Sequence, residues 1–294
     1  MIFLTLNYFS SLFQLTYDFL DWFTDCIYTN GVYYAYDNHS KAIWMKAIDN
    51  NPPVKWMSID LYQYTGSCLR VALNGEALLV NQNQKAIVAI HLTSKKQIKL
   101  TIPSQDSKIT DHEPFGELED HLVTKTDDGW IHLHKFDFNT NTAKIVSKLK
   151  IEFVEGREEQ AMTLSVSPNS KFIAVTTRDK KSMLSRLFII EVKDDLTLVV
   201  KHTKDVNSLN IKYFFSTVFH EFVNNRLVVA GLTCSHPKSM FCLFEYDVIN
   251  NLCDLIEDFT DSFDFYVPLK MVMNEGVIHA TDYKGRLLSV KFSC

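Results

Sequence analysis

Residues 162–192, MTLSVSPNSKFIAVTTRDKKSMLSRLFIIEV, carry the clearest structural pattern in the chain. The first residues alternate apolar and polar, and residues 167–170 supply turn chemistry. Residues 172–175 form an apolar run of buried-strand length, and residues 187–192 form another after the charged segment RDKK. The pattern predicts three short antiparallel strands. Because such a sheet cannot bury both faces alone, the segment indicates one unit of a repeat.

The same order of polar turn and central apolar strand occurs six times along the chain. The central strands are spaced 44 to 55 residues apart and contain Tyr33, Leu78, Leu122, Ile173, Val228 and Ile278. A period of this size, with three or four short strands per unit, is typical of β-propellers. Helical repeats of similar length need apolar residues at a spacing of 3.6, which these segments lack.

Two kinds of segment resemble WD repeats. SPNSKFIAV resembles their turn and inner strand, and TDDGWIHLHKFD (126–137) and TDYKGRLLSVKF (281–292) resemble their endings, with His134 and Val290 at the usual tryptophan position. We therefore expect an all-β, WD-repeat-like β-propeller of six blades, with seven as the alternative, in a single domain, residues 1–294. Residues 1–25 are expected to supply a strand that closes the ring, followed by an irregular segment.

Composition narrows the class of protein. The 294 residues are 46% hydrophobic, with 7 Pro and 9 Gly, which fits a globular chain with a core. The six cysteines show no C-x-x-C spacing, as expected in a reducing compartment, and we expect the nucleus, with the cytoplasm as the alternative. The apolar start lacks a basic leader region and is interrupted by polar residues, so neither a signal peptide nor a membrane helix is expected.

Charge is distributed unevenly. The whole chain has a net charge of −5, whereas residues 141–204 contain 12 basic and 8 acidic residues. The sharpest acidic run lies between Asp254 and Asp264. An ordinary solvated surface explains this distribution, and so does a docking edge for an acidic protein surface or a phosphate backbone.

Residue patterns for chemistry are weak. Trp130, His132 and His134 share one face of a strand, but no further ligand completes a metal site. Asp127 and its acidic neighbours fall in turns, and Cys234 near His236 lacks a third catalytic partner. No phosphate-binding or nucleophile motif occurs. We expect no catalytic residue, no cofactor and no metal.

A more specific resemblance lies in residues 162–186. This stretch resembles a signature of the non-catalytic WD-repeat subunit of tRNA (guanine-N(7)-)-methyltransferase. Matching positions include Val166, Ser167, Pro168, Lys171, Phe172, Ile173, Thr176, Arg178, Asp179, Lys181 and Ser185. Lys180, Ser182 and Met183 depart from the pattern, and the expected arginine comes three residues late, at Arg186.

The resemblance implies a subunit without chemistry of its own. Its propeller would dock on a separate methyltransferase catalytic subunit as a heterodimer, through Arg178, Asp179, Lys181 and Arg186. S-adenosylmethionine would belong to the partner, and tRNA would be contacted indirectly through the complex. The alternatives are a WD-repeat adaptor in another assembly, or a small propeller hydrolase or lactonase.

Overall fold

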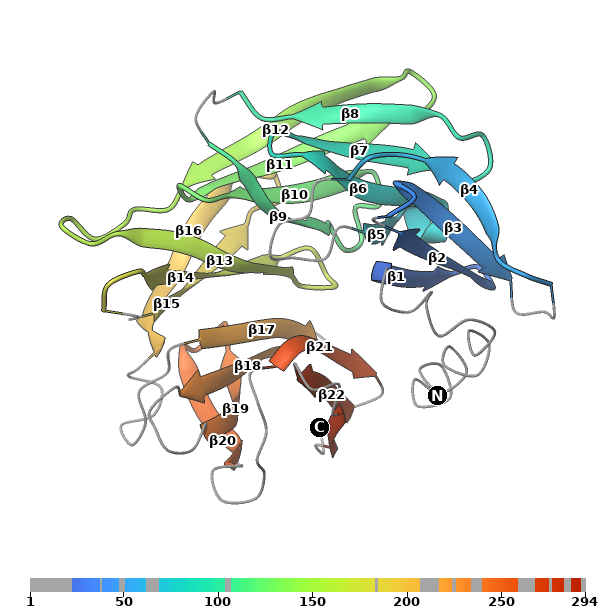
Figure 1. Ribbon diagram of the computed structural model, residues 1–294. Helices are drawn as coiled ribbons and strands as arrows, with labels where there is room; N and C mark the ends of the chain where they lie inside the picture. Colours follow the sequence, from blue (N-terminus) through green and yellow to red (C-terminus); the bar gives the residue numbers. More distant parts are fainter. Residues whose placement is uncertain are drawn as a thin grey trace. The chain divides into compact units, whose positions relative to one another are not determined.

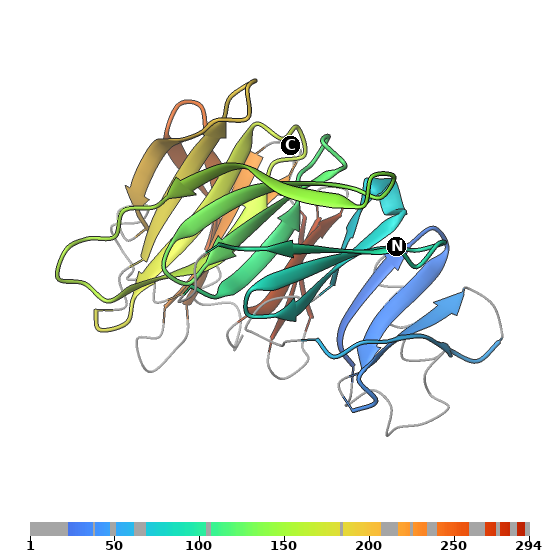
Figure 2. The same ribbon diagram turned by 90° about the horizontal axis from the view of Figure 1, so that it is seen from above.

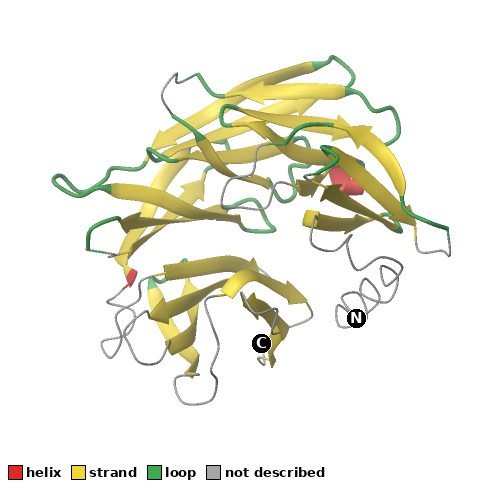
Figure 3. Ribbon diagram, in the orientation of Figure 1, coloured by secondary structure: helices red, strands yellow, loops and turns green. Residues whose placement is uncertain are grey.

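The computed structural model describes residues 23–291, apart from residues 38, 48–50, 62–68, 104–106, 183–184, 207–216, 224–225, 234–239, 259–267, 275–276 and 283–286. In these residues the chain forms six antiparallel sheets, five of four strands and one of three (Figure 1). We number the sheets as blades one to six in chain order. Strands make up nearly all of the regular structure in the described residues, and the short 3₁₀ helix η1 Leu73–Gly75 lies between β5 and β6 (Figure 3).

Each blade is an up-and-down meander. Blade one contains β1 Phe23–Thr29, β2 Val32–Asp37, β3 Ala42–Ala47 and β4 Val54–Ser58; blade two contains β5 Leu69–Ala72, β6 Ala77–Asn83, β7 Ala86–His91 and β8 Gln97–Thr101. Blade three contains β9 Ile109–Pro114, β10 His121–Thr126, β11 Trp130–Asp137 and β12 Thr142–Lys150; blade four contains β13 Glu159–Val166, β14 Phe172–Asp179, β15 Ser185–Val192 and β16 Leu198–Asp205. Blade five contains β17 Thr217–Val223, β18 Arg226–Thr233, β19 Met240–Asp247 and β20 Leu252–Asp258; blade six contains β21 Pro268–Asn274, β22 Val277–Asp282 and β23 Leu287–Lys291. Consecutive strands run side by side in every blade (Figure 2).

The chain divides into two compact units. The first comprises residues 1–103 with 136–143, and the second comprises residues 104–135 with 144–294. In the first unit β1 lies beside β5, and in the second unit β9, β13, β17 and β21 follow one another side by side. The first strand of each blade thus contacts the first strand of the next blade within its unit.

Apolar side chains between neighbouring blades form the cores. In the second unit, one cluster joins Ile131 and Leu133 of blade three to Ile173 and Val175 of blade four. Alternate residues of the same β14 strand, including Ala174, belong to a second cluster that reaches blade five. The central strand of blade four is therefore buried on both faces, which explains its continuous apolar run.

The expected repeat is confirmed strand by strand. All six anchor residues lie in the second strand of a blade: β2, β6, β10, β14, β18 and β22. The expected closing strand falls in residues 1–22, outside the described residues, and residues 23–25 belong to β1 of blade one. The single-domain organisation stays a prediction.

The turn at residues 167–170, between β13 and β14, links blades three and four. Ser170, at φ 57, donates its hydroxyl to the Phe115 carbonyl at 2.9 Å and accepts the Glu117 amide at 2.8 Å. Gly116 lies between them, and a Cβ there would be 2.5 Å from Pro168 O. The left-handed Ser170 and the side-chain-free Gly116 allow the two turns to interlock.

A candidate docking surface at one end of blade four

The structure brings all four predicted docking residues to one end of blade four. Arg178 and Asp179 are the last residues of β14, Lys181 lies in the following turn, and Arg186 is the second residue of β15. In the register, Arg178 is opposite Ser185, and Asp179 is opposite Glu159 of β13. Glu159 and Asp179, 20 positions apart in the sequence, therefore meet at this end.

Asp179 holds the turn together. Its carboxylate accepts the Ser182 hydroxyl and the backbone amides of Ser182 at 3.1 Å, Lys181 at 3.4 Å and Glu158 at 3.1 Å. The Ser182 hydroxyl, followed by these amides, lowers the pKa of Asp179 to about 2. Asp179 is buried and fixes the turn; its direct contact with a partner stays a prediction.

The same arrangement recurs at three other turns. Asp37 accepts the amide and hydroxyl of Ser40, Asp137 accepts the Thr140 hydroxyl, and Asp247 accepts the Asn250 amides. A D-x-x-[S/T/N] tetrapeptide therefore closes a hairpin in four of the described blades. This tetrapeptide is the sequence signal that predicts an aspartate-capped turn.

Arg186 forms an ion pair inside the blade. Its guanidinium forms two hydrogen bonds to the Glu159 carboxylate: Nε donates to Oε1 at 3.0 Å, and Nη2 donates to Oε2. Nη2 also donates to the Glu152 carbonyl at 3.0 Å. The Glu159 side chain is 1% exposed and the Arg186 side chain 15%. The guanidinium also lies 4.8 Å from the Phe188 ring centroid. In the structure described, Arg186 organises the end of the blade; direct contact with a partner stays a prediction.

Lys181 is an accessible cation of the turn. Its ammonium lies 2.8 Å from Glu158 Oε1, and the two side chains are 73% and 58% exposed. The hydrogen bond from Lys181 to Glu158 raises the lysine pKa. A pair this exposed contributes little to stability, so both side chains are available to a partner at low cost.

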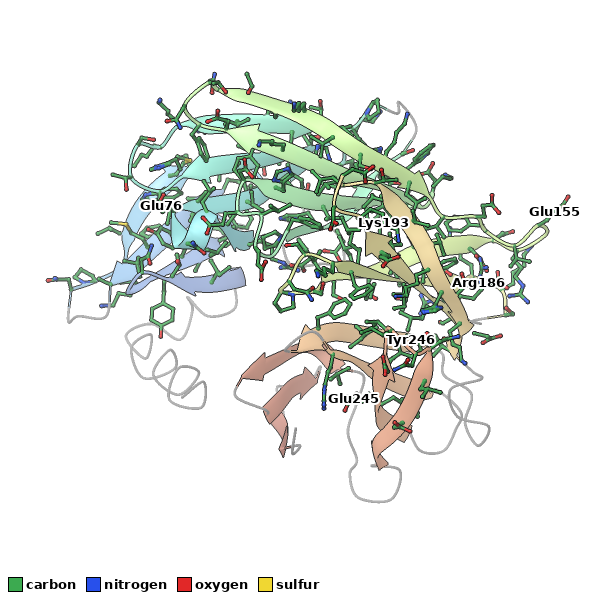
Figure 4. The ribbon with its side chains drawn as sticks, turned by 180° about the vertical axis from the view of Figure 1, so that it is seen from behind. Glu76, Glu155, Arg186, Lys193, Glu245 and Tyr246 are labelled. Carbon is green, nitrogen blue, oxygen red and sulfur yellow. The ribbon has the colours of Figure 1, made fainter. Side chains whose placement is uncertain are left out.

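A second segment, which the sequence reasoning missed, completes the surface. Residues 151–158 connect blades three and four, and we call them the connector. Glu158 donates its amide to Asp179 and accepts the Lys180 amide at 3.1 Å, while Glu152 accepts Arg186. Figure 4 shows Glu155 of the connector and Arg186 of β15 on the same side of this unit.

The connector presents an apolar side chain beside these charges. Its tip is a turn in which the Arg157 amide donates to the Val154 carbonyl at 3.1 Å, with Gly156 at φ 80. The Val154 side chain is 37% exposed at this turn. The segment V-E-G-R, an apolar residue before a glycine turn, is the sequence signal that could have found it.

The surface as a whole carries no excess of positive charge. The connector with Glu159, together with residues 178–186, contains five basic residues (Arg157, Arg178, Lys180, Lys181, Arg186) and five acidic ones (Glu152, Glu155, Glu158, Glu159, Asp179). The basic excess of residues 141–204 therefore lies elsewhere on blades three and four.

The other polar clusters have structural roles. His132 and His134 are buried on β11, and His134 Nε2 lies 3.0 Å from the Thr124 hydroxyl. Burial lowers the pKa of His132 to about 4 and that of His134 to about 3. Asp127 accepts the Asp128 amide in its own turn, as expected, and also the Lys108 amide from the segment before β9. Within the described ranges no three His, Cys, Asp or Glu side chains gather to hold a metal, and Cys234 and His236 lie outside them.

No protein-family model and no curated protein matches the chain. Solved structures do. The Cps50 (Swd1) β-propeller domain of Myceliophteria thermophila aligns over 92% of this chain and 84% of its own, with a TM-score of 0.58 and 12% identity. The fold is a β-propeller. A chain of the mitotic checkpoint complex aligns over 92% and 74%, with a TM-score of 0.61 and 12% identity.

Propellers in enzyme structures are also similar. A putative 6-phosphogluconolactonase from Bacteroides uniformis aligns over 90% of this chain and 78% of its own, with a TM-score of 0.62 and 13% identity. The tricorn protease aligns over 91% of this chain, at a TM-score of 0.54 and 10% identity, and this chain spans 29% of the protease chain. At such identities the likeness concerns the fold.

In the part of the chain that is described, no helix is long and apolar enough to cross a membrane.

Proposed function

We propose that this chain is a non-catalytic WD-repeat scaffold whose fourth blade docks on the catalytic subunit of a tRNA (guanine-N7) methyltransferase. Support for the scaffold comes from the propeller fold and from an accessible, preorganised surface at the end of blade four. Support for this partner comes from the resemblance of residues 162–186, whose described residues lie in β13, β14, β15 and the turns that follow β13 and β14.

The network of hydrogen bonds and ion pairs at this end of blade four is the observation that carries the proposal. The Asp179 cap, the Arg186–Glu159 pair and the connector contacts fix the backbone before a partner arrives. Because less conformational entropy is lost on association, a preorganised surface binds more tightly than a mobile one. Lys181 then offers a charge, and Val154 an apolar contact, on a backbone that these contacts hold in place.

The test starts with mass spectrometry of the proteins that co-purify with the tagged chain, which identifies the partner. Affinity for the isolated partner is then measured for the wild type and for an Arg178→Glu, Lys181→Glu variant. We expect at least a tenfold loss, because rim charges that face opposite charges become repulsive. A partner that is not a methyltransferase would support the adaptor alternative.

Lys41→Glu is the matched control. Lys41 follows the equivalent aspartate-capped turn of blade one and lies 3.2 Å from Asp60, much as Lys181 lies near Glu158. The Lys41→Glu variant should bind the partner like the wild type. Equal affinity of all three proteins would show that blade four is not the docking site.

A further inference from the structure

The basic excess of residues 141–204 is concentrated on the last strand of blade three. Outside the docking surface this segment retains seven lysines (Lys144, Lys148, Lys150, Lys171, Lys193, Lys201, Lys204) and three acids (Glu191, Asp194, Asp195). Glu191 lies 2.5 Å from Lys193 and 3.9 Å from Lys201, so the charge of blade four is partly neutralised. Strand β12 contains three of the lysines and no acid.

These three lysines are accessible. Strand β12 is the end strand of its sheet, and Lys144, Lys148 and Lys150 are all exposed. Lys150 lies 3.0 Å from Asp128, whereas no ion pair is recorded among the described residues for Lys144 or Lys148. Lys148 and Lys150 are two residues apart, which separates their Cα atoms by about 7 Å along the strand.

Protection of the sheet edge against unwanted strand pairing does not explain why β12 carries only positive charges. Charges on an end strand prevent unwanted pairing, and either sign serves that purpose. The end strand of blade five, β20, contains Asp254, Glu257 and Asp258 and no basic residue. The two end strands thus carry opposite charges, which would attract a polyanion to blade three and repel it from blade five.

Two of the lysines lie over an aromatic ring. The ammonium groups of Lys148 and Lys150 lie 5.6 Å and 5.3 Å from the centroid of Trp130, which is partly exposed on the adjacent strand β11. An aromatic ring among lysines is the combination with which proteins bind single-stranded nucleic acid, since bases stack on the ring and phosphates contact the charges.

We propose that Trp130, Lys144, Lys148 and Lys150 form a surface on blade three that binds the phosphate backbone of single-stranded RNA, with an unpaired base on Trp130. Carboxylate partners are matched best by arginine forks, and neither β11 nor β12 contains an arginine. The choice of RNA over DNA rests on the function proposed above. The inference that the lysine–tryptophan surface binds a single-stranded nucleic acid does not depend on that function.

The test uses the full chain and a short fluorescein-labelled single-stranded RNA, with fluorescence anisotropy measured over a salt series. The Lys144→Ala, Lys148→Ala variant should bind about tenfold more weakly at low salt. The magnitude of the slope of log K against log salt should fall by about 0.7 for each lysine removed. The matched control is Lys55→Ala, Lys99→Ala, which removes exposed lysines from the end strands of blades one and two.

Tryptophan emission tests the stacking contact. RNA should quench the emission of the wild type, and the conservative Trp130→Phe variant should lose that quenching while it still binds. Absence of wild-type binding at low salt, or an unchanged salt slope in the β12 variant, would overturn the proposal. Partner capture by the β12 variant should equal that of the wild type, so failure of docking and failure of RNA binding are separate results.

Discussion

Arg186 and Glu159 form an ion pair that spans the central strand of blade four. Arg186 is on β15 and Glu159 is on β13, and the two strands flank β14. Glu159 is also opposite Asp179, another buried acid, in the β13–β14 register. The two carboxylates coexist because one is held by a guanidinium and the other by hydroxyl and amide donors.

Removal of the arginine should therefore destabilise the fold. Arg186→Ala leaves the Glu159 carboxylate buried, with Arg157 4.0 Å away as the remaining recorded cation. We expect a loss of about 2–4 kcal/mol in the free energy of unfolding, measured by urea denaturation. The Arg186→Ala, Glu159→Gln double variant should recover part of this loss, because it removes the unpaired charge. A loss below about 0.5 kcal/mol in the single variant would contradict this account.

The interlocked turns of blades three and four predict a second effect. Gly116→Ala places a Cβ 2.5 Å from both Pro168 O and Ser170 Oγ, at φ +47, and should cost about 2–4 kcal/mol in unfolding experiments. Gly156→Ala is the matched control, since it also lies at positive φ, +80, but meets no atom within 4 Å. It should cost only about 1 kcal/mol. Equal losses of unfolding free energy in the two variants would mean that the close approach of Gly116 to Pro168 and Ser170 does not contribute to stability.

The buried histidines predict a pH dependence. The pKa values of His132 and His134 are lowered to about 4 and about 3, so the unfolded chain binds more protons than the folded one below about pH 6.5. Their contribution is fully present above that pH and is lost as the pH falls toward 4. Each should add at most about 1.4 kcal/mol per pH unit to the slope of stability.

A variant with both histidines replaced by Gln should show a flatter slope between about pH 6.5 and pH 5. The slope, rather than the absolute stability, is the readout. His39→Asn, which changes an exposed turn residue, should leave the slope unchanged. An unaltered slope in the double Gln variant would assign the pH dependence to other groups.

Val154 should contribute to partner binding and not to folding. Val154→Asp introduces a charge at a side chain that is already 37% exposed, so the urea midpoint should shift little. Partner affinity should fall at least tenfold, because a desolvated carboxylate would face the partner. Val200→Asp, at the same 37% exposure on β16, is the control. Similar affinities for both variants would exclude the connector from the interface.

The repeat was predictable where the second strand of a blade contains an apolar run preceded by turn residues, as in Phe172–Asp179. The docking surface was predictable only in part. The register that places Glu159 beside Asp179 and Arg186 depends on pairing across the blade, which local pattern does not show. For the same reason the acids of the connector, which neutralise the positive charge of residues 178–186, were not assigned to that end.

The Asp179 cap at the end of β14 holds its turn without using the side chains at the tip, Lys180 and Lys181. Asp179 is bound through backbone amides and one hydroxyl, and the adjacent strands pair independently of the residues at the tip. New side chains, a spectroscopic label or a crosslinking group could therefore be introduced at Lys180 or Lys181 without altering the strands beneath. The hairpin is a natural grafting position, at which recognition can be reprogrammed while the scaffold stays the same.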